Sequence, residues 1–131
     1  MTEIVHEWIA KAEEDFASAK LVIDPSHGKP NYDLVCFLTQ QCVEKYLKGY
    51  LQHRGVAFAK THDLEFLLDL ALPFQPLWES WRSAFARLTE YAVEFRYPGD
   101  WANPSKAERA LKIASSFRSD ARRAFELSSD K

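Results

Sequence analysis

Apolar residues recur at the three- and four-residue spacing of an amphipathic helix along almost the whole chain. The first predicted helix covers residues 2–22 and stops at residues 24–30, where two prolines and a glycine interrupt the pattern. The second covers residues 31–53. We expect Asn31 to cap its beginning and Gly55 to follow its end.

The later part of the chain predicts three more helices. The third begins after Thr61, which we expect to be its N-cap, and two prolines close it. The fourth carries the apolar residues between positions 78 and 95 and ends near Arg96. The fifth begins with Asn103 as N-cap and Pro104 as its first residue. No alternating strand pattern is present, so we predict an all-α, five-helix antiparallel up-and-down bundle.

Composition narrows the class of protein. The length of 131 residues suits a single domain, residues 1–131, and the apolar fraction of 47% is sufficient for a core. A net charge of −2 gives no overall attraction to nucleic acid or to an acidic membrane, and no apolar stretch is long enough to span one. Cys36 and Cys42 point to different sides of one predicted helix, so no disulfide joins them and we expect a cytoplasmic protein.

Sequence motifs of common enzyme classes are absent. The chain has no glycine-rich phosphate loop and no Gly-x-Ser-x-Gly motif. Its histidines lie in different predicted segments, and the cysteines lack metal-ligand spacing. We therefore expect no metal site and no cofactor.

The second predicted helix carries a polar stripe. Its members are Gln41, Glu44, Lys45, Lys48 and Gln52. The simplest interpretation is a solvated face, in which Glu44 and Lys48 form an i,i+4 ion pair. Gln40 lies instead on the apolar side, where a buried amide needs a hydrogen-bond partner. We expect that partner on another helix or across an interface.

Two further positions are chemical candidates. Arg96 ends the fourth predicted helix at the edge of its apolar stripe, where it either caps carbonyls or presents a planar donor to a phosphate or carboxylate. Tyr97 beside it can stack on a base or simply pack. His62 and Asp63 begin the third helix, and His62 is either an acid–base group or part of a polar helix start.

Several segments together resemble HEPN domains (higher eukaryotes and prokaryotes nucleotide-binding). Residues 36–51 resemble the second helix of that family and residues 61–64 the start of its next helix. Residues 88–98 resemble the segment that ends helix four, and residues 8–12 with Asp15 fit the first helix. The segments occur in the family's order and spacing and cover most of the chain.

The resemblance implies a helical bundle that is usually a homodimer. Many such proteins are encoded beside a minimal nucleotidyltransferase, as toxin–antitoxin pairs. Others are metal-independent ribonucleases, in which an arginine and a histidine four to six residues later act at the dimer cleft. Arg96 occupies the arginine position and is the candidate catalytic residue. Positions 101–103 are Trp, Ala and Asn, and no histidine follows Arg96.

Three functions remain open. The first is a non-catalytic HEPN module that binds a nucleotide phosphate or a nucleotidyltransferase partner; its binding residues would be Arg96, Tyr97, Lys45 and Lys48. Its cleft or interface residues would be Gln40, Gln41, Glu44, His62, Asp63 and Tyr91. The second is a ribonuclease that uses Arg96 with His62 or Glu44 as a non-standard base. The third is a structural helical adaptor.

Overall fold

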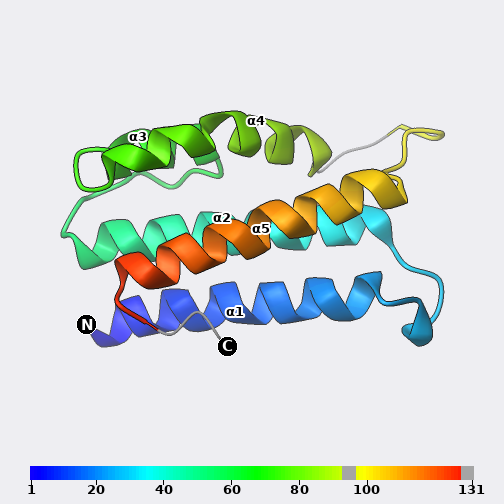
Figure 1. Cartoon of the computed structure of the whole chain (residues 1–131), viewed down its shortest axis with the longest axis horizontal. Coiled ribbons are helices and arrows are strands. Elements are labelled where there is room, and N and C mark those ends of the chain that lie inside the picture. The colour runs from blue at the N-terminus through cyan, green and yellow to red at the C-terminus, as the bar shows by residue number, and fades with distance from the viewer. Residues whose placement is uncertain (93–96, 128–131) are drawn as a thin grey trace.

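The computed structural model describes residues 1–92 and 97–127, and all regular structure in these residues is helical (Figure 1). This confirms the predicted all-α bundle. The five α-helices of the described residues are α1 (Glu3–Ile23), α2 (Tyr32–His53), α3 (Leu64–Ala71), α4 (Arg82–Tyr91) and α5 (Pro104–Ala124). Two short 3₁₀ helices, η1 (Pro25–His27) and η2 (Pro76–Trp81), lie between them.

Short polar side chains begin the long helices where the sequence predicts it. The Asn31 side chain accepts a hydrogen bond from the backbone N–H of Leu34 at 3.0 Å. The Asn103 side chain accepts one from Lys106 at 2.8 Å, and Pro104 follows as the first helical residue. Each cap satisfies a donor that the helix itself leaves unpaired, which fixes where α2 and α5 begin.

The predicted cap of α3 is wrong by two residues. Asp63, and not Thr61, is the N-cap, and its Oδ1 accepts from the N–H groups of Glu65 at 3.0 Å and Phe66 at 3.2 Å. Thr61 Oγ1 instead accepts from the N–H of Asp63 at 3.1 Å. A carboxylate at this position also interacts favourably with the positive end of the helix, which a threonine hydroxyl does not match.

The predicted fourth helix is two elements. Residues 76–81 form η2, and α4 begins only at Arg82. Pro76 stands in the first turn of η2, and in a 3₁₀ helix side chains three residues apart lie above one another. Trp78 and Trp81 can therefore both face the core without an α-helix between them. α4 ends at Tyr91, before the predicted end near Arg96, and Arg96 lies outside the described residues.

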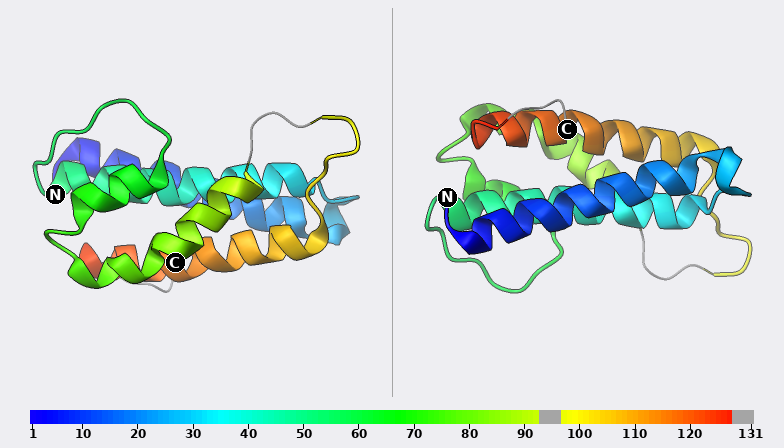
Figure 2. Two further views of the ribbon diagram at one scale, coloured as in Figure 1. Left: turned by 90° about the horizontal axis from the view of Figure 1, so that it is seen from above. Right: turned by 90° about the horizontal axis from the view of Figure 1, so that it is seen from below.

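The helices pack so that α2 lies at the centre of the molecule. α1 runs antiparallel to α2, whereas α5 runs beside α2 in the same direction, so α2 and α5 begin at the same end (Figure 1). Residues 54–63 return the chain along α2, and α3 therefore starts beside the middle of α2 (Figure 2). Gly49 lets α1 come close, because a Cβ there would lie 2.9 Å from Cβ of Trp8.

A polar cluster joins the first, second and last long helices. Arg118 of α5 donates from Nε and Nη2 to the Glu13 carboxylate of α1, at 2.6 and 2.7 Å. The Tyr46 hydroxyl of α2 also donates to Glu13, and Nη1 of Arg122 donates to that hydroxyl at 3.3 Å. We call Glu13, Tyr46, Arg118 and Arg122 the Glu13 cluster. A bidentate arginine–carboxylate pair fixes geometry as well as charge, so the cluster sets the position of α5 against α1.

Burial raises the pKa of two side chains at the Glu13 cluster, one within it and one beside it. Burial raises the pKa of the Tyr46 phenol, and its hydrogen bond to Glu13 raises it further. Burial likewise raises the pKa of the Cys42 thiol, with Glu13 and Asp15 adding to the effect. Cys36 and Cys42 are both buried and form no disulfide. No helix of the described residues has the length and apolar character needed to cross a membrane.

Candidate functional site

The polar stripe of α2 is largely covered and not solvated. Only 3% of Glu44 and 8% of Lys48 is exposed, so the predicted solvated face is wrong at these two positions. Nζ of Lys48 lies 2.8 Å from a Glu44 carboxylate oxygen, which confirms the expected i,i+4 pair in a buried setting. The stripe is covered because residues 54–63 pass along this side of α2 (Figure 2).

His62 is the residue of the returning segment that contacts the stripe. Its Nδ1 lies 3.0 and 3.1 Å from the two carboxylate oxygens of Glu44. Nε2 of Gln40 donates to the backbone carbonyl of His62 at 3.2 Å. Gln40 is only 8% exposed and its amide has a partner, but the expected place of that partner, on another helix or across an interface, is wrong. The partner lies within the same chain, on the segment that leads into α3.

The histidine and its carboxylate differ strongly in exposure. The side chain of His62 is 79% exposed, whereas that of Glu44 is 3% exposed. A buried carboxylate that contacts Nδ1 fixes the orientation of an imidazole and leaves Nε2 for other interactions. This is the arrangement of the described residues that most resembles an acid–base pair.

The lysines of α2 both have carboxylate partners. Nζ of Lys45 lies 2.6 Å from Asp15 of α1, and their side chains are 23% and 17% exposed. Lys48 pairs with Glu44, and Gln41 between the two lysines is half-buried. Binding of a phosphate by Lys45 or Lys48 would have to break one of these pairs, and this assignment stays a prediction.

A second region lies where α2 and α5 begin. Tyr97 is 73% exposed and Trp101 is 72% exposed, which is unusual for such large rings. One hollow lies between them and is lined by Asp33, Tyr97, Pro98, Asp100 and Trp101. A second hollow, of about 540 Å³, is lined by residues 29–33 on one side and by residues 101–104 on the other. Trp101 borders both.

The same end of the molecule carries groups of both signs, because two helix N-termini and Lys29 border the second hollow together with the Asp33 carboxylate. The second hollow lies between the first residues of two helices of about six turns each, and helix N-termini carry partial positive charge. Oδ1 of Asp33 accepts a hydrogen bond from the backbone N–H of Ala102 at 2.8 Å, and this bond holds the two helix starts together. Lys29 adds a cation to the wall of this hollow.

The remaining candidates are Tyr91, Asp63 and Arg96. Tyr91 is buried, and its hydroxyl accepts from Nη1 of Arg109 at 3.4 Å. Asp63 is occupied as the cap of α3. Arg96 lies outside the described residues, so the predicted cation at this site has no structural description. The structure thus brings together Gln40, Glu44, Lys48 and His62.

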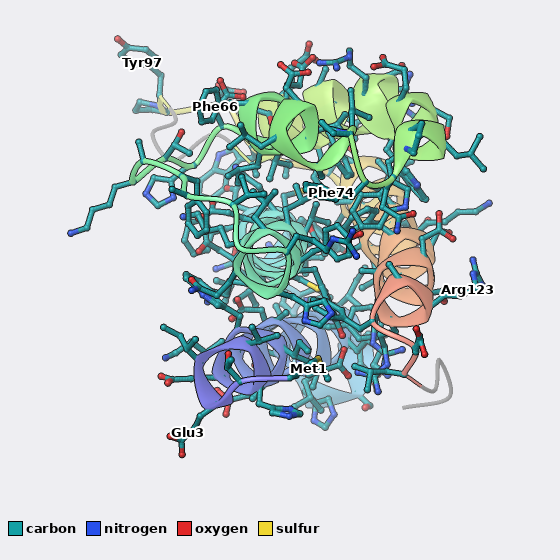
Figure 3. The ribbon with its side chains drawn as sticks, turned by 90° about the vertical axis from the view of Figure 1, so that its left-hand side faces the viewer. Met1, Glu3, Phe66, Phe74, Tyr97 and Arg123 are labelled. Carbon is teal, nitrogen blue, oxygen red and sulfur yellow. The ribbon has the colours of Figure 1, made fainter. Side chains whose placement is uncertain are left out.

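The two regions face the same side of the molecule. Figure 3 shows Tyr97 and Phe66 on one side of the bundle, where the segment that leads into α3 also lies. Among the described residues, no group of three or more histidine, cysteine, aspartate or glutamate side chains could hold a metal ion. Trp101 is not among the residues predicted from the sequence. A tryptophan in a polar turn, between Asp100 and the cap of α5, is the signal that would have indicated it.

Comparisons with known proteins agree with the predicted resemblance. A family model described as "HEPN domain" matches residues 5–124. Among solved structures, the crystal structure of an archaeal HEPN homologue is similar, with a TM-score of 0.67 and 25% sequence identity. The similarity covers 95% of this chain and 98% of that chain. No curated protein matched the chain.

Proposed function

Because the chain belongs to the HEPN domain family, we propose that it is a non-catalytic nucleotide-binding module that works with a protein partner. No histidine follows Arg96 in the sequence, so the arginine–histidine pair of the family's ribonucleases is incomplete. Phosphodiester cleavage needs a group that accepts a proton and a group that stabilises charge, and Arg96 suits only the second role. Binding without cleavage is therefore the function that the residues favour.

The exposed rings of Tyr97 and Trp101 carry this proposal. Both are more than 70% exposed and border one hollow. Exposed aromatic faces are stacking platforms for nucleobases, and each stacked base contributes about 1–3 kcal/mol. The two helix starts beside Trp101 suit the phosphate of the same ligand. Base and phosphate would thus bind within one continuous surface.

The test is to titrate the full-length protein with adenosine monophosphate and with the other three ribonucleotides, and to measure binding by calorimetry. We expect Trp101→Ala to weaken binding by about tenfold or more, the size expected for the loss of one stacked ring. Leu77→Ala is the matched control, because Leu77 is 87% exposed and lies on the separate α3–α4 connection. Wild-type protein without affinity for any nucleotide would leave the structural adaptor as the better function.

We also propose that the protein acts as a homodimer. Leu34 and Phe37, near the start of α2, are 38% and 40% exposed, and Phe66 of α3 is 43% exposed. Large exposed apolar side chains are typical of protein interfaces. Analytical ultracentrifugation should show a dimer that Phe37→Asp dissociates and Leu77→Asp does not. A wild-type monomer at high concentration would contradict this part of the proposal.

The partner that the family suggests is a minimal nucleotidyltransferase, in a toxin–antitoxin-like pair. Its gene is expected beside the gene of this chain, and co-expression with affinity purification of either protein is the direct test. We propose the cytoplasm as its location, and two buried cysteines that form no disulfide fit its reducing conditions. A neighbouring gene of another class, with no co-purification, would remove the nucleotidyltransferase from the proposal.

One observation favours a second function, metal-independent RNA cleavage. Nδ1 of His62 contacts the buried Glu44 carboxylate, and the ring is 79% exposed. In this reaction Nε2 of His62 would take the proton of a 2′-hydroxyl, whose oxygen bonds to phosphorus while the bond to the 5′-oxygen breaks. The 5′-oxygen would then take that proton from the imidazolium.

The cleavage assay is incubation of RNA with the protein in a chelator. Loss of products in His62→Ala and in Arg96→Ala, with His27→Ala as control, would support cleavage by this chain. Equal products from all variants would identify a contaminating nuclease, and no products from any of them would exclude the reaction.

A further inference from the structure

We call the segment between α2 and α3, residues 54–63, the strap; its Val56 and Phe58 side chains are partly buried against the core. It runs back along α2 and beside the N-terminal half of α1 (Figure 2). At its beginning the N–H of Val56 donates to the carbonyl of Leu51 at 2.9 Å. Further along, the ring of Phe58 lies 6.5 Å from that of Trp8. Residues 54–63 have no helical structure, so we expect the strap to open at lower free-energy cost than the helices.

The end of the strap is fixed by His62. Its imidazole contacts Glu44, and its backbone carbonyl accepts from Gln40. These two interactions join the strap to successive turns of α2. The loss of His62 side-chain contacts would leave one amide hydrogen bond to hold this end.

The Lys48 side chain lies against two groups that the strap also contacts. This side chain is 10% exposed, and its Nζ lies 2.8 Å from Glu44 and 5.8 Å from the centre of the Trp8 ring. The strap contacts both of these groups, because His62 binds Glu44 and Phe58 packs on Trp8. The two groups that hold the Lys48 ammonium are therefore the two that hold the strap.

We propose that the strap gates Lys48 and that its opening makes this ammonium a binding group for an anion of the phosphate class. In the closed state Glu44 neutralises Lys48 and the strap excludes solvent. When His62 is released, water reaches the Glu44–Lys48 pair, and an ion pair in water is weak enough for a phosphate to compete with the carboxylate. This inference is independent of the surface at Trp101, so each can fail without the other.

The test is lysine acetylation of the full-length protein with acetic anhydride, read for each residue by mass spectrometry. In His62→Ala we expect Lys48 to react about tenfold faster or more, the size expected for the loss of a hydrogen bond to a charged group. His62→Gln should restore part of the protection, because its amide can still donate to Glu44. Lys45 is the internal control, since its ion pair with Asp15 does not involve the strap.

A control variant addresses general loosening of the fold. His27→Ala removes an exposed histidine of the α1–α2 connection, whose Nε2 lies 3.8 Å from Asp24, and should leave Lys48 protected. If circular dichroism shows that His62→Ala does not fold, Gln40→Ala removes the other tie and should give a smaller rise at Lys48. Unchanged Lys48 reactivity in folded variants, or an equal rise at Lys45, would overturn the gate.

The ligand is tested in His62→Ala with inorganic phosphate, at constant ionic strength maintained with chloride. Phosphate should slow acetylation of Lys48 and leave Lys45 unchanged. Protection of neither lysine, or of both equally, would overturn the assignment of Lys48 as an anion-binding group.

Discussion

Two ion pairs on α2 should respond very differently to removal of their carboxylates. Glu44→Ala removes the partner of Lys48, whose side chain is 10% exposed, and leaves a buried cation without a counter-charge. Removing one member of a buried pair costs about 3–5 kcal/mol. Asp15→Ala removes the partner of Lys45, whose side chain is 23% exposed and can be rehydrated. We expect a cost of about 1 kcal/mol or less for this more exposed pair.

Urea unfolding, monitored by circular dichroism, measures the loss of stability in both variants. A loss of about 3–5 kcal/mol is a large fraction of the roughly 5–15 kcal/mol that stabilises a typical domain. The urea midpoint of Glu44→Ala should therefore lie clearly below that of Asp15→Ala. The double variant Glu44→Leu with Lys48→Leu should regain most of the loss, because apolar groups replace both members of the pair. Equal losses for Glu44→Ala and Asp15→Ala would refute the reasoning from burial. A double variant as unstable as Glu44→Ala would show that the loss comes from the strap and not from the stranded ammonium.

Three further changes test other parts of the structure. Gly49→Ala should lower the free energy of unfolding by about 1–2 kcal/mol, since overpacking against Trp8 exceeds the gain in helix propensity; an increase in thermal stability would contradict the close approach of α1. The free energy of unfolding should fall as the pH rises above about 8.5. Burial raises the pKa of the Cys42 thiol, so above this pH the unfolded state loses the thiol proton while the folded state keeps it. The expected slope is up to about 1.4 kcal/mol per pH unit for this thiol. Cys42→Ala should flatten this alkaline slope, and an unchanged slope would count against it. Gln40→Leu should lower the melting temperature and leave the dimer intact, because its bond to His62 lies within one chain; dissociation without a change in melting temperature would show an intersubunit role.

The starts of α2 and α5 could be predicted from the sequence because their causes are local. Asn31 and Asn103 cap the helices that follow them, and a side chain within three residues decides each boundary. The region of residues 76–81 could not be assigned in this way. A three-residue spacing of tryptophans suits an α-helix and a 3₁₀ helix equally, and only packing distinguishes the two.

The candidate site was predictable only in part. Gln40 indicated a buried partner because an amide among apolar residues has to be satisfied. Glu44 and Lys48 gave no such signal, since their stripe has the composition of a solvated face. What buries them is the strap, which has no periodic pattern of its own and returns along α2 for tertiary reasons. The contact of His62 with Glu44 follows from that return and has no signature in either segment alone.

The Glu13 cluster also determines when this chain can fold during its synthesis. Glu13 and Tyr46 are made early, yet Arg118 and Arg122, which satisfy them, belong to the last helix. A nascent chain that has emerged only as far as α4 carries a carboxylate and a phenol facing the place of an absent helix, and burying them without partners is costly. The α1–α2 hairpin therefore cannot bury these two groups until α5 has emerged from the ribosome. A message truncated before α5 would yield a product that chaperones and proteases recognise as incomplete.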